Sequence, residues 1–182
     1  MNYYVSDLHF GHAGIIQMCN RPFLNVNDMD EVLIQNWNQY ISENDDVFIL
    51  GDFCYKANNP KKYLSRLSGH KHLIIGNHDG MILKNQECRK YFENIRDIMT
   101  IKDKNQQVVL CHYPMIEWNG YFRDTLHFYG HIHNNTTNNA YRIMSHVENA
   151  YNVGADILDF VPRTLEKVIQ YNIQFKERNK IN

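Results

Sequence analysis

The chain lacks the features that mark membrane, secreted and disulfide-bonded proteins. No apolar stretch approaches the roughly 18 residues that a transmembrane helix needs, and the first residues do not follow a signal-peptide pattern. The four cysteines show no C-x-x-C spacing, so neither a disulfide framework nor a cysteine-based zinc site is indicated. We therefore expect a cytoplasmic protein with reduced thiols and no membrane partner.

An excess of charge of one sign is also missing. With 19 Lys and Arg against 20 Asp and Glu, the formal net charge is −1, so bulk electrostatics does not draw the chain to nucleic acid. Nucleic acid stays an alternative partner through a local patch at Lys56, Lys61 and Lys62. The length of 182 residues fits a single domain over residues 1–182. The oligomeric state stays open.

Short apolar segments alternate with amphipathic ones along the early part of the chain, and the later part is rich in strands. We expect strands at 2–6, 47–50, 72–75, 95–101, 107–111, 125–129, 141–144 and 149–154. We expect helices at 27–42, 60–67, 85–92 and 162–169, the first of them capped by Asn27. This order predicts a layered α/β fold.

Polar residues rich in histidine stand where five of the expected strands end. They occur in the order Asp7-Leu8-His9, Gly51-Asp52, Gly76-Asn77-His78-Asp79, His112 and Gly130-His131-Ile132-His133. Ligand sites in open α/β sheets gather beyond the carboxyl ends of the strands, so these side chains should share one cleft. The glycines before Asp52, Asn77 and His131 are expected to let the backbone turn sharply there.

The residue types in this set indicate two divalent cations. Neutral imidazole and carboxylate oxygen, without thiolate, suit manganese, iron, nickel and zinc, and we expect manganese first with the others as alternatives. Too many candidate ligands are present for one tetrahedral ion: Asp7, His9, Asp52, Asn77, His112, His131 and His133. Because a carboxylate can bridge two ions, Asp52 is the candidate bridge.

A pair of ions about 3.5–4 Å apart suits in-line displacement at phosphorus, with a metal-bridging hydroxide as the nucleophile. No G-x-S-x-G motif offers a serine nucleophile instead. Arg21 is a candidate for holding the phosphate, although a structural salt bridge is an equal alternative for it. His12 and Lys56 are further candidates for substrate contact.

The ordered motifs over residues 7–133 resemble the signature of the calcineurin-like metallophosphoesterase superfamily. This resemblance implies a four-layer α/β/β/α sandwich with a dimetal site at the strand ends. It implies that one ion takes Asp7, His9, Asp52 and His133, and that the other takes Asp52, Asn77, His112 and His131. His78 would contact the phosphate and protonate the leaving oxygen.

The sequence departs from the protein-phosphatase branch of that superfamily at residues 51–57. That branch continues G-D-x-x-D-R-G, whereas this chain has Gly51-Asp52-Phe53-Cys54-Tyr55-Lys56-Ala57, so a phosphoserine or phosphothreonine phosphatase is not expected. The chain resembles instead the small bacterial and phage phosphoesterases.

We expect hydrolysis of a small phosphodiester as the function. A phosphomonoesterase acting on nucleotides or sugar phosphates and a nuclease are the alternatives. A non-catalytic scaffold is the interpretation least favoured, because the full ligand set and His78 are present.

Overall fold

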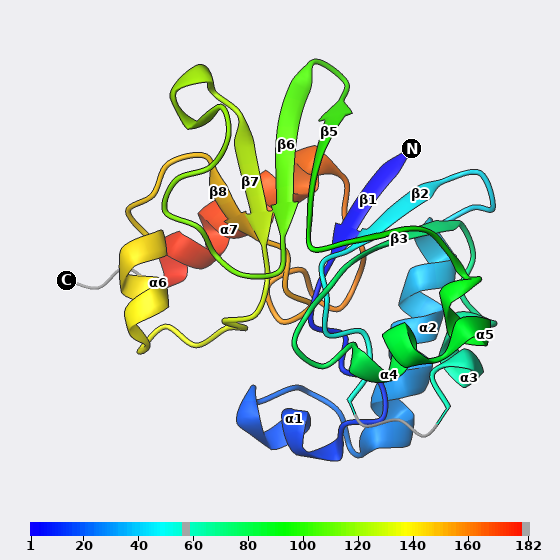
Figure 1. Ribbon diagram of the computed structural model, residues 1–182. Helices are drawn as coiled ribbons and strands as arrows, with labels where there is room; N and C mark the ends of the chain where they lie inside the picture. Colours follow the sequence, from blue (N-terminus) through cyan, green and yellow to red (C-terminus); the bar gives the residue numbers. More distant parts are fainter. Residues whose placement is uncertain (56–58, 180–182) are drawn as a thin grey trace.

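The computed structural model describes residues 1–55 and 59–179, and these contain two four-stranded β-sheets (Figure 1). The first sheet is parallel and has the order β1 (Asn2–Val5), β2 (Asp46–Ile49), β3 (His70–Ile74) and β4 (Phe92–Arg96). The second has the order β5 (Ile98–Asp103), β6 (Gln106–Cys111), β7 (Leu126–Tyr129) and β8 (Ala150–Asn152). In the second sheet only the β5–β6 pair is antiparallel.

Helices flank the two sheets. On the side of the first sheet lie α2 (Val26–Tyr40), α3 (Lys61–Leu64), α4 (Gly80–Lys84) and α5 (Gln86–Arg89). On the side of the second sheet, α6 (Asn139–Met144) covers the outer face and α7 (Leu165–Arg178) packs along β8 and β1. The expected four-layer α/β/β/α sandwich is confirmed. In the described ranges no helix is both long enough and apolar enough to cross a bilayer.

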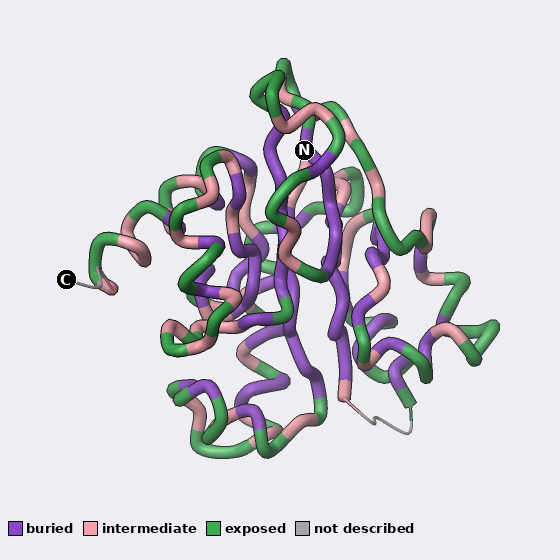
Figure 2. Tube along the Cα trace, turned by 60° about the vertical axis from the view of Figure 1, so that its left-hand side comes forward, coloured by how far each residue is buried: buried purple, intermediate pink, exposed green. Residues whose placement is uncertain are grey.

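Alternating side chains of the first sheet divide between two hydrophobic cores. Tyr4, Phe48 and Ile74 point toward the second sheet, where they join Val108 and Phe128. This is the period-two pattern of a sheet that is buried on both faces. Strands β2, β3, β6 and β7 are therefore mostly buried, whereas β4 and β5 are largely half-buried or exposed, and the buried segments run through the middle of the molecule (Figure 2).

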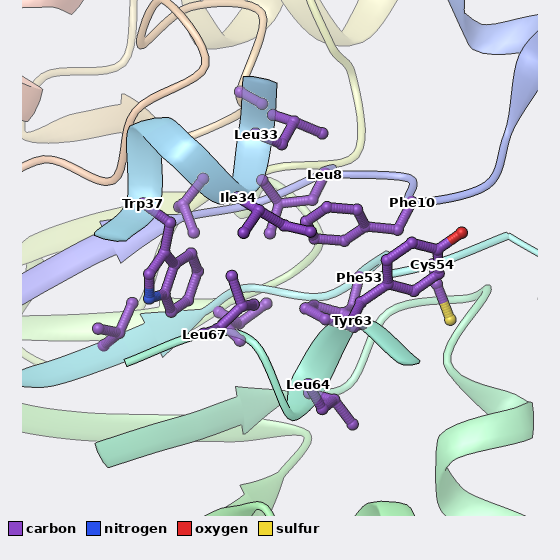
Figure 3. Close-up of a cluster of buried hydrophobic side chains, with 14 of the residues drawn as sticks. Leu8, Phe10, Leu33, Ile34, Trp37, Phe53, Cys54, Tyr63, Leu64 and Leu67 are labelled. Atoms are coloured by element: carbon purple, nitrogen blue, oxygen red, sulfur yellow. The ribbon is translucent and has the colours of Figure 1, made fainter. Parts of the chain in front are cut away.

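The opposite face of the first sheet packs against α2 and α3. Trp37 is 1% exposed and lies in this core with Leu33 and Ile34 of the same helix, and Tyr63 and Leu64 of α3 join them (Figure 3). Trp37 is thus a packing residue, and its indole Nε1 donates a hydrogen bond to the backbone carbonyl of Ser68, in the loop between α3 and β3.

Helix α2 begins earlier than the sequence predicted. Asn25, not Asn27, is the N-cap, and its Oδ1 accepts the N–H groups of Asn27 and Asp28. Asp30, which was expected to complete a capping box, is buried instead. Its carboxylate accepts hydrogen bonds from the N–H of Gly11 and the hydroxyl of Tyr63. That carboxylate therefore ties the loop after β1 to α3.

Two predicted elements over residues 85–101 have other bounds in the structure. The expected strand 95–101 is two strands, because β4 ends in the first sheet at Arg96 and β5 starts in the second sheet at Ile98. The expected helix 85–92 is shorter in the structure, because α5 covers only Gln86–Arg89 and β4 already begins at Phe92. The preceding α4 was not predicted, and it is separated from α5 at Asn85, whose side chain caps α5.

The prediction of a strand at 141–144 was wrong, and the last helix is longer than expected. Residues 139–144 form α6, which is capped by Asn138 and buries Tyr141 and Met144. The final helix, expected at 162–169, runs from Leu165 to Arg178. Buried Asn172 lies in the additional turns of this helix and joins them to β8, because its side chain exchanges hydrogen bonds with the backbone of Asn152.

His127 is a fully buried, neutral histidine in β7. Its Nε2 accepts the backbone N–H of Met115, so the proton lies on Nδ1, which donates to the carbonyl of Val109. Burial lowers the pKa of His127 to about 4. Protonation of His127 would therefore place a charge in the protein interior and break the hydrogen bond from the N–H of Met115.

We predict that His127 makes the fold sensitive to acid. Because its pKa is lower in the folded protein (about 4) than in the unfolded chain, its contribution is complete above about pH 6.5 and is lost as the pH falls toward 4. The loss should reach roughly 3 kcal/mol. Urea unfolding in EDTA from pH 7 to 4 should show a shallower decline for His127→Gln, which keeps one donor and one acceptor. Parallel curves for the two proteins would contradict this.

Candidate metal centre

The predicted ligands come together where strands of both sheets end. Asp7 and His9 follow β1, Asp52 follows β2, and Asn77 follows β3, all in the first sheet. His112 directly follows β6 and His131 and His133 follow β7, both in the second sheet. The site is therefore built between the two sheets, at their shared carboxyl edge (Figure 1).

One carboxylate oxygen, Oδ2 of Asp52, lies at the centre of this arrangement. The Nε2 atoms of three histidines face it, at 3.7 Å for His9, 3.6 Å for His112 and 3.9 Å for His78. These distances are too long for hydrogen bonds. The other oxygen, Oδ1, accepts the backbone N–H of His78 at 2.9 Å. Oδ2 is thus free to bind a cation.

The described residues contain ligand groups on both sides of this carboxylate. One group is Asp7, His9 and His133, and another is Asp52, His112 and His131. Asn77 adjoins the second group, with its Oδ1 3.2 Å from Nε2 of His112. The structure thus brings all seven candidate ligands together.

The donor atoms fit divalent cations. Nε2 of His9 is buried and has no hydrogen-bond partner among the described residues, which is costly unless a cation binds it. Nδ1 of His112 lies 2.7 Å from the carbonyl of Leu50 and must donate to it, so Nε2 keeps its lone pair for a metal. These observations match what a metal site requires of its imidazoles.

The electrostatics of the cation-free site are unfavourable. Burial raises the pKa of Asp7 and lowers the pKa of His9 to about 2. Burial also lowers the pKa of His131, and the neighbouring His112 adds to this. Burial opposes the charge on His133 too, but its hydrogen bond to Asp156 prevails and raises the pKa of His133 to about 10. Bound cations would stabilise the carboxylates and displace the proton of His133.

The backbone is strained at the ligands themselves. Five of them are non-glycine residues in the left-handed region, with φ of 56° for Asp7, 54° for His9, 53° for Asp52, 69° for His131 and 50° for His133. This conformation costs of order 1 kcal/mol or more per residue and persists at functional sites where the surrounding structure enforces it. The backbone therefore turns sharply at these five candidate ligands.

The neighbouring glycines allow close approach of the two sheets. A Cβ on Gly130 would lie 2.0 Å from Oγ of Ser6 and 2.5 Å from Oδ2 of Asp7. A Cβ on Gly51 would lie 2.6 Å from both Gly76 and His112, and the φ of Gly51 is +82°. The prediction that glycine provides a turn thus holds for Gly51, whereas Gly130 is needed for space.

Asp79, to which the sequence assigned no role, organises the loops after β2 and β3. It is fully buried, and its carboxylate accepts the N–H groups of Asp52, Phe53 and Gly76 at 2.8–3.0 Å. Burial raises its pKa to about 6 although these hydrogen bonds oppose the shift. Asp79 thus fixes the backbone that presents Asp52 and Asn77.

Asp156 was also missed as a functional residue. It accepts hydrogen bonds from Nδ1 of His133 (2.9 Å) and from Nε of Arg21 (2.8 Å). Burial alone would raise its pKa, but His133 and Arg21 outweigh burial and lower it. The thiol of Cys19 lies close to both His133 and Asp156. Nδ1 of His133 is nevertheless hydrogen-bonded to Asp156. A carboxylate behind a ligand histidine fixes the ring and its tautomer.

The structure does not support Arg21 as a phosphate ligand. Its side chain is fully buried, and its guanidinium donates to Asp156 and to the carbonyls of Asp7 and Leu8. Every guanidinium nitrogen is therefore engaged, and the alternative of a structural ion pair is the one observed. Sequence reasoning could not choose, because the partner lies 135 residues away along the chain.

His78 and His12 border the open side of the site. The side chain of His78 is 35% exposed, so the ring can meet a substrate. His12 lies with its Nδ1 3.4 Å from Nδ1 of His9, and its ring stacks on Tyr55 with centroids 3.8 Å apart. Tyr55 also meets His78 edge to face. Lys56, the other candidate, lies outside the described residues.

Comparison with known proteins identifies the family. The family model for the calcineurin-like phosphoesterases matches residues 3–160, most of the chain. The chain belongs to this family. It is therefore a metal-binding hydrolase that acts on phosphate esters. Membership implies a dinuclear divalent metal centre, and the ligand groups described above suit one.

Three proteins are similar to this chain over much or most of its length. An uncharacterized protein of Methanocaldococcus jannaschii is 33% identical over 171 residues, 92% of this chain and 89% of its own. The gene 66 protein of Mycobacterium phage L5 is 27% identical over 132 residues, 63% of each chain. The crystal structure of a protein of unknown function from Aquifex aeolicus covers 93% of this chain and 98% of its own, with 27% identity and a TM-score of 0.72.

We predict that Asp156→Asn weakens metal binding about 10- to 100-fold, because His133 loses the carboxylate that orients it. Calorimetric titration with Mn²⁺ measures this directly, and the calorimetric enthalpy of each step separates the two ions. Asp28→Asn, at a half-buried position of α2 outside the ligand groups, is the matched control. Unchanged affinities in a folded Asp156→Asn protein would exclude the orienting role.

Proposed function

We propose that the protein hydrolyses small phosphodiesters with the help of two divalent cations. The observation that carries this proposal is the position of Asp52, whose free Oδ2 faces both His9 and His112, members of the two ligand groups. A carboxylate so placed can bridge two ions. Asp7, His9, Asp52 and His133 would hold one ion, and Asp52, Asn77, His112 and His131 the other.

The two ions would supply an activated water molecule and stabilise charge on the phosphate. Manganese is the expected metal, with iron, zinc and nickel as alternatives that the same imidazole and carboxylate donors accept.

His78 would bind the phosphate and donate a proton to the leaving oxygen. Its backbone N–H is held by Oδ1 of Asp52, so the ring is positioned relative to the ligands. Its ring is partly exposed beside His9, with centroids 5.4 Å apart. A general acid must reach the leaving group at the open side of the site, and the partial exposure of His78 beside His9 supports this role.

The internal hydrogen bonds of Arg21 favour a diester substrate over a monoester. A monoester dianion carries one more negative charge than a diester, and a free guanidinium is a common means of holding it. The guanidinium of Arg21 instead donates hydrogen bonds to Asp156 and to two backbone carbonyls. A phosphomonoesterase and a nuclease remain the alternatives, and the net charge of −1 argues against general affinity for nucleic acid.

The choice between ester classes can be tested directly. With Mn²⁺ present, we expect kcat/KM for bis-p-nitrophenyl phosphate to exceed that for p-nitrophenyl phosphate by about tenfold or more, because Arg21 is not available to hold the extra negative charge of a dianion. Asp52→Asn should abolish both activities with the melting temperature in EDTA little changed. A reversed ratio would favour the monoesterase, and activity that survives in Asp52→Asn would exclude the proposed centre.

The role of His78 predicts a dependence on the leaving group. His78→Ala should lower kcat by about 10²- to 10⁴-fold for a diester with an alkoxide leaving group, which needs a proton. The loss should be much smaller for p-nitrophenolate, which departs without one. His146→Ala, at an exposed histidine of the turn after α6, is the control. Equal losses for both leaving groups would show that His78 is not the acid.

A further inference from the structure

A groove adjoins the metal centre on the side of the second sheet. It has a volume of about 330 Å³ and lies between the end of α1 (Ala13–Met18) and residues 131–140. His131 and His133, two of the proposed metal ligands, form one wall of it. A substrate held at the cations would therefore have its organic substituent directly beside this groove.

The remaining wall of the groove is neutral and carries amides. Asn134, Asn135 and Asn138 line it, together with the apolar side chains of Met18 and Ala140. No Lys, Arg, Asp or Glu contributes to the lining among the described residues. Such a surface suits an uncharged group with many hydrogen-bonding atoms, and it offers nothing to neutralise a second phosphate or a charged peptide.

Each asparagine has one end of its amide unused. Nδ2 of Asn134 donates to the carbonyl of Cys19, which joins the two sides of the groove. Oδ1 of Asn135 accepts from Thr137, and Oδ1 of Asn138 accepts the N–H that caps α6. Oδ1 of Asn134 and Nδ2 of Asn135 and Asn138 make no hydrogen bond within the described ranges. They are one acceptor and two donors for a ligand.

We propose that this groove binds the nucleoside part of a phosphodiester, an inference that rests on the proposed function. The amides match the base edges and sugar hydroxyls of a nucleoside, and Met18, 75% exposed, offers its thioether to the flat face of the base. The volume is at the small end of ligand sites, which suits one nucleoside. The enzyme therefore selects diesters in which one ester group is a nucleoside.

Two substrates with the same leaving group test this. The p-nitrophenyl ester of thymidine 5′-monophosphate and methyl p-nitrophenyl phosphate are both singly charged diesters that release p-nitrophenolate. We expect kcat/KM to be at least about tenfold higher for the nucleoside ester, since bound hydrogen-bonding groups discriminate strongly. Ala140→Phe, which fills the groove, should bring the ratio of the two constants close to one.

Two further variants make the test specific. Asn138→Asp keeps the Oδ1 that caps α6 but removes the Nδ2 donor, and it should also lower the ratio. Any general repulsion of phosphate by the new charge affects both esters and cancels in the ratio. Ile143→Phe places the same ring on an exposed position of α6 outside the groove and should leave the ratio unchanged.

A binding measurement separates this inference from the proposed function. Calorimetric titration of the Mn²⁺-loaded protein should show tighter binding of thymidine 5′-monophosphate than of methyl phosphate, and Ala140→Phe should remove the difference. If the protein cleaves neither ester but shows this difference, the proposed function fails and the nucleoside groove stands. Equal binding in the wild type, or a substrate ratio that survives both Ala140→Phe and Asn138→Asp, would overturn the inference.

Discussion

The metal centre depends on the close approach of the two sheets at their carboxyl edge. The carboxylate of Asp7, at the end of β1, accepts the backbone N–H of His131, just after β7, at 2.9 Å. Gly130 makes this approach sterically feasible, because any side chain there would collide with Ser6 and Asp7. The hydrogen bond between Nδ1 of His112 and the carbonyl of Leu50 joins the ends of β6 and β2 in the same way, so the candidate ligands of the two sheets share one cleft.

Around this contact, buried carboxylates act as a second layer that holds the ligands. Asp79 binds three backbone N–H groups in the loops that present Asp52 and Asn77. Asp156 fixes the ring of His133 and is itself paired with Arg21. A buried charge that loses its partner is strongly destabilising. Asp79 and Asp156 each have more than one hydrogen-bond partner.

The same layer explains how the strained backbone persists. The left-handed conformations of the ligands are unfavourable one by one, and a short loop would relax to a commoner conformation. Here the loops are bonded to each other, for example from the N–H of His9 to the carbonyl of Asp52 and from Gly130 to His112. The strain is maintained because the sheets and buried carboxylates fix both ends of each turn.

The sequence by itself determined the layered fold, the order of the strands that end in ligands, and the chemical type of the site. These follow from local properties: apolar runs, the residues at their ends, and the donor atoms of imidazole and carboxylate. These properties predicted the seven candidate ligands that the structure brings together: Asp7, His9, Asp52, Asn77, His112, His131 and His133. The errors in the fold, such as the strand expected at 141–144, arose where short apolar segments suit either a helix or a strand.

Only the tertiary structure decided which residues support the ligands and where a substrate can lie. Arg21 is as plausible a phosphate ligand as an ion-pair residue until Asp156 is found beside it, 135 positions later in the chain. Asp79 belongs to one of the sequence motifs and Asp156 to none, but the sequence predicts the role of neither, because a loop carboxylate has the same local pattern whether it binds metal, backbone or water. The groove between α1 and residues 131–140 exists only because the folded chain brings two distant segments together. The packing of the folded chain determines which residues pair across so many positions of the sequence, and a local sequence pattern does not contain this information.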